Sequence, residues 1–158
     1  MKNILIIGLC FFSLGLWAQP KGLPVNVYDS LMFKYPDATD LKSKKQKDDF
    51  RIRFENKGIK ITSIYDAAGN WKESVSILKE ENIPDNIKKS IKKKYTEGFI
   101  SSVNLVEDNK GKIIYEATVD TEKYLINLEL DNNGKILKTD QVRKETPSSN
   151  QGSGTDEE

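Results

Sequence analysis

A phrase of seven residues occurs twice in the sequence, and its two copies lie 65 positions apart. Residues 65–71 read YDAAGNW and residues 130–136 read LDNNGKI. Each copy has an apolar residue, Asp, two small or polar residues, Gly, a polar residue and an apolar residue. Asp and Asn form turns through their side chains, and Gly accepts a positive φ without steric cost. The phrase therefore predicts the same turn in two copies of one structural unit.

The match between the copies extends towards the N-terminus at the same offset. The aligned apolar pairs are Phe50 with Tyr115, Ile52 with Ala117, Phe54 with Val119, Ile59 with Tyr124, Ile61 with Ile126, Tyr65 with Leu130 and Trp71 with Ile136. In both copies apolar and polar residues alternate, which is typical of half-buried strands. Either copy alone would expose the apolar side of its sheet, so we expect the two copies to fold together.

A helix is predicted before each set of strands. Residues 25–35 read VNVYDSLMFKY and residues 83–95 read IPDNIKKSIKKKY, with apolar residues three and four positions apart in both. Pro36 ends the first helix, and Asp85 suits the positive end of the second. The predicted buried stripes are Val27, Tyr28, Leu31, Met32 and Tyr35 in the first helix, and Ile87, Ile91 and Tyr95 in the second.

A strand is also predicted directly after each helix, and a short extension after each Asp-Gly turn. The strand at residues 99–107 is clear, but residues 38–49 contain Leu41 as their only large apolar residue. The latter strand is therefore expected to be an exposed edge or irregular. The expected fold class is α+β, with two tandem helix-strand-strand-strand repeats at about 24–78 and 83–142. They should form one antiparallel sheet with both helices on one face.

The N-terminus indicates export. Lys2 is followed by an almost wholly apolar run at residues 4–17 and then by Ala18, which is typical of a secretory signal peptide. The run is shorter than the ~20 residues of a membrane span, although an uncleaved anchor is the alternative. We predict cleavage after Ala18, a periplasmic or secreted location and no stable membrane span after cleavage. Residues 19–143 would form the domain and residues 144–158, which lack aliphatic and aromatic residues, a disordered tail.

The composition removes most catalytic and metal chemistry. The sequence has no histidine, and its one cysteine, Cys10, lies in the predicted signal peptide. Hydrolytic triads, thiol nucleophiles and ordinary zinc sites are therefore not expected. The net charge of +1 gives no general signal for nucleic acid. Enzyme chemistry would need paired carboxylates, such as Asp48 and Asp49, in a pocket that separates their pKa values. We expect no catalytic residue, no cofactor and no metal.

The turn residues of the repeated phrase and its final residue could each have a function instead of a structural role. Asp131 and the two asparagines after it offer oxygen ligands for Ca²⁺, but Ala67 and Ala68 occupy the corresponding places in the first copy. Turn chemistry is therefore the favoured interpretation. Trp71 could anchor a partner if it were exposed. Because it aligns with Ile136, we predict a core position shared by both copies.

The alternation also defines the side of the sheet that faces away from the core. The candidate partner-binding residues on that side are Arg51, Arg53, Lys60, Thr62, Ile64, Glu116, Leu125, Asn127 and Glu129, with Thr118 beside them. The residues from the first copy are basic and those from the second acidic. One interpretation is cross-strand charge pairing on a solvated face. The other is a surface whose charge is complementary to a protein partner.

The second predicted helix offers another surface. Lys92, Lys93 and Lys94 follow one another near its end, and anionic membranes attract such clusters. A solvated polar face explains these lysines equally simply, since the apolar stripe of the helix already accounts for its buried side. A structural or sensing component at an anionic membrane surface is therefore the alternative to protein binding.

Four stretches carry a resemblance to a known family. They are KYPDA (34–38), DFRIRFENKG (49–58), YDAAGNWKES (65–74) and IPDNIKKSIKKKY (83–95). Their order resembles that of the PepSY-like family of exported bacterial proteins, also described as beta-lactamase-inhibitor-like. The resemblance covers roughly residues 24–140. The chain departs from the family's pattern around Ser43, where the family often has Trp, and at Ile83, where Leu is usual.

The resemblance implies a fold like that of the beta-lactamase inhibitor protein (BLIP), an exported location and no catalysis. Inhibitors of that architecture bind an enzyme through the open face of the sheet, and PepSY domains are associated with restraining peptidases. The predicted function is a non-catalytic binding module for an unidentified protein. A peptidase or another envelope enzyme is the candidate partner. No nucleic-acid partner is expected.

Overall fold

The computed structural model describes residues 22–145, and these form a helix and four strands, twice over. The first unit contains α1 (Val25–Lys34), β1 (Ala38–Gln46), β2 (Asp49–Asn56), β3 (Ile59–Asp66) and β4 (Trp71–Ile77). The second contains α2 (Asp85–Lys94), β5 (Phe99–Asp108), β6 (Ile113–Asp120), β7 (Tyr124–Asp131) and β8 (Ile136–Arg143), and a short 3₁₀ helix, η1 (Glu80–Asn82), connects the units. The predicted signal peptide and residues 146–158 of the predicted tail lie outside the described residues.

All eight strands belong to one antiparallel sheet, in which the strands lie side by side in chain order. This confirms the expected α+β fold with its single antiparallel sheet. Each unit has one strand more than the predicted helix-strand-strand-strand pattern. The expected short extensions are full strands, because the Asp-Gly turn sends the chain straight back along the strand that it has just left. Ile61 thus pairs with Ser76, and Leu125 with Val142.

The first strand of the first unit is an exposed edge, as predicted. Most of β1 is exposed, and its pairing with β2 is interrupted by an irregularity between Thr39 and Lys42. Irregular, lysine-rich edges discourage pairing with another chain.

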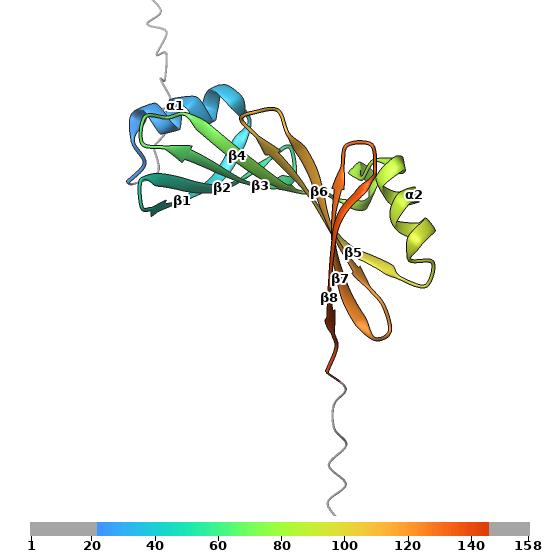
Figure 1. Ribbon diagram of the computed structural model, residues 1–158. Coiled ribbons are helices and arrows are strands. Elements are labelled where there is room, and N and C mark those ends of the chain that lie inside the picture. The colour runs from blue at the N-terminus through green and yellow to red at the C-terminus, as the bar shows by residue number, and fades with distance from the viewer. Residues whose placement is uncertain (1–21, 146–158) are drawn as a thin grey trace, which may run out of the picture.

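The pairing register places both helices on one face. Residues directly opposite each other in an antiparallel pair point to the same side of the sheet. The buried Ile61 is opposite Ser76, Ser76 is opposite Leu105, and Leu105 is opposite the buried Tyr115. The buried side of one unit therefore continues into that of the other. Figure 1 shows the sheet bending between its halves, with α1 and α2 on the outer side of the bend.

The core is divided into two clusters, one beneath each helix. The first cluster comprises Leu23, Val27, Leu31, Ala38, Phe50, Ile52, Phe54, Ile61 and Tyr65. The second comprises Ile83, Ile87, Ile91, Val103, Tyr115, Ala117, Val119, Ile126, Leu128 and Leu130. They share no buried residue, and Ser74 and Ser76 lie on the same face of the strand next to the second unit. Each half of the sheet is therefore stabilised mainly by packing against its own helix.

The repeated phrase is a turn in both units, as predicted. Asp66 accepts hydrogen bonds from the backbone N–H groups of Ala68 and Asn70, each at 2.9 Å. The side-chain and backbone hydrogen bonds from Asn70 hold the pKa of Asp66 below its usual value. Asp131 accepts the equivalent pair of bonds. Within residues 22–145 no group of three or more His, Cys, Asp or Glu side chains could hold a metal ion.

Each turn is fastened to its helix through a glycine. Gly69 has a φ of 88°, and a Cβ atom there would lie 2.7 Å from the backbone oxygen of Asn26. Asn26 in turn donates to the backbone oxygen of Ala67 at 2.8 Å. The second unit repeats this arrangement with Gly134, Asn86 and Asn132. The phrase is therefore a piece of scaffold that holds a strand connection against a helix.

Candidate functional site

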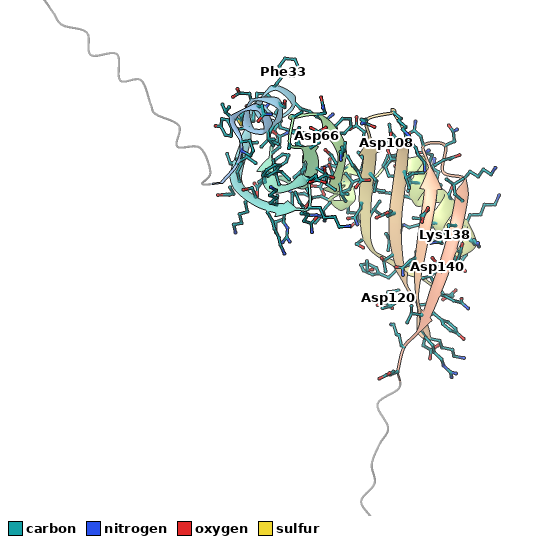
Figure 2. The ribbon with its side chains drawn as sticks, turned by 60° about the vertical axis from the view of Figure 1, so that its left-hand side comes forward. Phe33, Asp66, Asp108, Asp120, Lys138 and Asp140 are labelled. Carbon is teal, nitrogen blue, oxygen red and sulfur yellow. The ribbon has the colours of Figure 1, made fainter. Side chains whose placement is uncertain are left out.

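The sheet face opposite the helices, here called the open face, collects the predicted partner-binding residues. The register places Arg51 opposite Ile64, and Arg53 opposite Thr62. All nine predicted residues share this face: Arg51, Arg53, Lys60, Thr62, Ile64, Glu116, Leu125, Asn127 and Glu129. In Figure 1 the open face lies on the inner side of the bend, and Figure 2 shows its β5–β8 part with α2 behind the sheet. Whether a partner binds there stays a prediction.

One end of the open face is basic. Lys42 lies directly opposite Arg53, and Lys44 directly opposite Arg51. These four residues are called the basic half. Arg51 donates to the side-chain oxygen of Gln46 at 3.0 Å, a neutral partner that leaves its charge uncompensated. Lys42 and Lys44 were not among the predicted residues, because an edge strand with one large apolar residue has no clear alternation from which to assign faces.

The other end is acidic. Glu116 lies directly opposite Glu129, and Asp120 and Asp140 share their side of the sheet. These four residues are called the acidic half. Lys138 lies 3.6 Å from Glu129 and 2.9 Å from Asp140, and these carboxylates raise the pKa of Lys138. An open hollow of about 260 Å³ lies here, and its lining includes Glu116, Asn127, Glu129, Lys138 and Asp140.

Apolar side chains separate the two charged halves. Val75 lies opposite Val106, and Val106 opposite Ile114. With Ile64 of the neighbouring strand, these residues form the apolar seam, in which Ile114 is buried and the others are half-buried. Only Ile64 was among the predicted residues, because the strand that pairs with β4 across the two units cannot be known before the strand order is known.

A second apolar group lies at the far end of the second unit. Phe99, Leu125 and Val142 share one row of the open face, and 73%, 37% and 59% of their surfaces are exposed. Leu125 was among the predicted residues. Because Asp120 lies in the same row, opposite both Phe99 and Leu125, acidic and apolar groups are next to each other at this end.

The register shows which charges of the open face lie opposite each other. Cross-strand charge pairing places opposite charges face to face, as it does for Lys60 with Glu55 and for Lys138 with Glu129. The pairs Lys42–Arg53, Lys44–Arg51 and Glu116–Glu129 instead place like charges face to face, which destabilises a sheet. Charge pairing within the sheet therefore accounts for only part of the pattern on the open face.

A hollow beside α1 has a different character. It encloses about 710 Å³ in an open shape, and Phe33, Lys34, Gly69 and Trp71 contribute to its lining. Phe33 is 92% exposed and projects away from α1 in Figure 2. The Nζ atom of Lys34 lies 3.6 Å from the centre of the Trp71 ring and 3.7 Å from Glu107. Phe33 was not part of the predicted buried stripe of its helix, and that spacing could have indicated that it is exposed.

Trp71 and Ile136 occupy equivalent positions, as their alignment predicts, but these lie at the edge of the core rather than within it. Both residues are half-buried, and each packs against the core cluster of its own unit. The indole N–H of Trp71 donates to Ser74 at 2.8 Å, and Tyr35 donates to the same oxygen at 2.8 Å. The Ser63 and Ser74 hydroxyls lie 2.5 Å apart, so the first core contains a buried polar cluster. The second unit has Leu128 in place of Ser63.

The hydroxyl group of Tyr65, in the first core cluster, leads to a prediction about stability. Its side chain is fully buried, its hydroxyl has no hydrogen-bond partner among the described residues, and burial raises its pKa. Removing a buried, unpaired hydroxyl relieves a desolvation cost of ~1–3 kcal/mol. Tyr65→Phe should therefore raise the free energy of unfolding by about 1 kcal/mol in urea titrations. Tyr35→Phe, which removes a paired hydroxyl, should lower it by a similar amount, and loss of stability in both variants would contradict the assignment.

The lysines of α2 lie on its exposed side. Lys92, Lys93 and Lys94 are exposed, whereas Ile87 and Ile91 are buried against the sheet. No apolar face of this helix is left to enter a membrane surface. Among residues 22–145, no helix is both long and apolar enough to cross a membrane.

Comparisons with solved structures identify the fold. A BLIP-like protein from Bacteroides fragilis aligns with a TM-score of 0.67 and 18% identity, covering 84% of this chain and 94% of that one. A DUF2874 family protein from Bacteroides uniformis aligns at 0.67 and 17%, covering 75% and 89%. A protein from Bacteroides eggerthii, assigned provisionally to the periplasm, aligns at 0.66 and 15%, covering 75% and 88%. No protein-family model matches the sequence, and neither does any curated protein sequence.

These likenesses show a BLIP-like fold, which confirms that part of the predicted resemblance. None of the three proteins is described as an enzyme. Membership of the PepSY-like family stays a prediction, because no family model supports it.

Proposed function

We propose that the protein is a non-catalytic, exported binding module that holds a protein partner against its open face. The candidate partner class is a peptidase or another envelope enzyme. Support comes from the BLIP-like fold, from the provisional periplasmic assignment of one structural relative and from the predicted signal peptide. The partner would meet a basic half, an apolar seam and an acidic half in that order.

The like-charge pairs of the open face carry this proposal. Lys42 opposite Arg53, Lys44 opposite Arg51 and Glu116 opposite Glu129 each place like charges face to face, and Lys138 offsets part of the repulsion in the last pair. A partner with acidic groups over the first half and basic groups over the second would turn this repulsion into attraction. Such complementarity mainly speeds association and selects the correct partner. The apolar seam would supply the dry centre that a stable interface requires.

Charge reversal on the open face tests the proposal. The purified protein is immobilised and used to capture partners from an envelope extract of the organism that encodes it. Arg51→Glu with Arg53→Glu should reduce capture of the principal partner at least about tenfold, or about 1.4 kcal/mol, because two attractive charge contacts become repulsive. Capture should also fall as salt is raised.

The matched control reverses two charges on the other side of the molecule. Lys92→Glu with Lys93→Glu makes the same change in net charge on the exposed side of α2. Capture should be unchanged in this variant. Equal loss in both variants would point to net charge, and loss in the control alone would overturn the open face as the docking surface. Sedimentation of the control with anionic vesicles examines the membrane alternative, which predicts salt-sensitive binding by the parent protein.

A further inference from the structure

The two edges of the sheet differ in whether another strand could join them. The β1 edge is blocked. Asp40 and Lys47 have positive φ values of 53° and 55°, and the pairing of β1 is irregular between Thr39 and Lys42. Lysines also line its second half. Irregular backbone and edge lysines are the devices by which sheets avoid joining other chains.

The β8 edge has fewer of these devices: its pairing is irregular only between Ile136 and Lys138, and Lys138 is its one lysine. Its pairing with β7 is regular from Lys138 to Arg143, and no residue in that stretch has a positive φ. Seven of its eight residues are exposed, including Leu137 at 50% and Val142 at 59%. A regular, exposed and partly apolar edge is a template for another strand.

The hydrogen-bond pattern shows which backbone groups are free. The N–H of Lys144 donates to the oxygen of Lys123, the residue directly opposite in the continued register. Bonded and non-bonded pairs alternate along an antiparallel ladder. Residues 138, 140 and 142 therefore bond inward to β7, whereas Thr139 and Gln141 present their N–H and C=O groups outward.

The sequence of this edge is complementary to itself. In an antiparallel pair of two β8 strands centred on Thr139, Lys138 of each copy lies opposite Asp140 of the other. A pair centred on Asp140 would oppose two aspartates, and one centred on Lys138 would oppose two lysines. Within one chain Lys138 and Asp140 lie 2.9 Å apart and are 57% and 59% exposed, so they can exchange this contact for the one between copies. Of these three registers, charge favours the one centred on Thr139.

We propose that the β8 edge binds a second copy of this chain, forming one continuous antiparallel sheet centred on Thr139. Residues opposite each other share a face, so the two open faces would lie on the same side of the dimer. The inference does not depend on the proposed function. The dimer could form whether or not the open face binds a partner, and if it does bind one, a dimer would offer two such faces together.

Sedimentation equilibrium of the purified protein, from micromolar concentration to about 1 mM, tests this inference. We expect a concentration-dependent dimer. Thr139→Pro removes an N–H that points outward and should abolish the dimer while leaving the bonds to β7 in place. A protein that stays monomeric over the whole range would overturn the proposal.

A charge-swap series tests the register and keeps the proposal falsifiable if the proline variant does not fold. Lys138→Asp places two aspartates opposite each other and should weaken the dimer about tenfold or more. Adding Asp140→Lys restores complementarity and should restore the dimer. Circular dichroism of each variant checks the fold. A dimer that persists in Lys138→Asp, or one that is lost in Arg51→Glu with Arg53→Glu instead, would place the contact elsewhere and refute the inference.

Discussion

Gly69→Ala is expected to lower the free energy of unfolding by about 3 kcal/mol. Two costs add in this variant. An L-residue at a φ of 88° is strained by roughly 1–2 kcal/mol. The added methyl group would also lie 2.7 Å from the backbone oxygen of Asn26, and overpacking of this kind costs typically 1–3 kcal/mol. Because that neighbour is backbone, α1 itself would have to move away from the turn.

Two other glycines serve as controls: one repeats both costs, and the other has the backbone strain alone. Gly134→Ala repeats both, since its Cβ would meet Ser90 and the backbone of Asn86, and it should destabilise by a similar amount. Gly111 ends a third turn of the same type, held by Asp108, with a φ of 78° and open space where its Cβ would be. Gly111→Ala should therefore cost only about 1 kcal/mol. Urea unfolding measures all three variants, and equal losses would contradict the docking role of Gly69 and Gly134.

Leu31→Ala and Ile91→Ala are each expected to lower the free energy of unfolding by about 2–5 kcal/mol. Both side chains are fully buried, and each belongs to the core cluster of its own unit. Because the two clusters share no buried residue, each substitution should loosen mainly its own unit. Hydrogen exchange followed by mass spectrometry should show faster exchange in β1–β4 for Leu31→Ala and in β5–β8 for Ile91→Ala.

The two variants serve as controls for each other, since each leaves the opposite cluster intact. Equal acceleration of exchange in both halves by either variant would show that the molecule has one cooperative core. In that case the division into two units would describe the chain's internal symmetry but not its energetics.

The sequence predicted the scaffold well, because period-2 alternation and the Asp-Gly turns are local signals. Residues 59–66 and 124–131 alternate clearly, and both are strands with the predicted faces. The full length of β4 was missed because WKESVSI has little alternation, and what makes it a strand is the pairing with β3 and β5. Strand pairing is a tertiary property that propensity alone cannot supply.

The candidate site was predicted in part for the same reason. The residues of β2, β3, β6 and β7 were assigned to the open face by alternation, but their neighbours across the sheet depend on the strand order. The opposition of Lys42 to Arg53 and the seam from Val75 to Ile114 follow only from the register. The buried cluster around Ser74 was missed because a short hydroxyl side chain gives no sign of its burial.

Lysine footprinting of the captured complex tests most directly whether the open face is the docking surface. Acetylation followed by mass spectrometry compares the free protein with its partner-bound form. Lys42, Lys44 and Lys60 of the open face are exposed, as are Lys92 and Lys93 of α2, so both sets can react in the free protein. We expect the partner to protect the first set and leave the second set reactive. Protection of the α2 lysines with an unprotected open face would contradict the account.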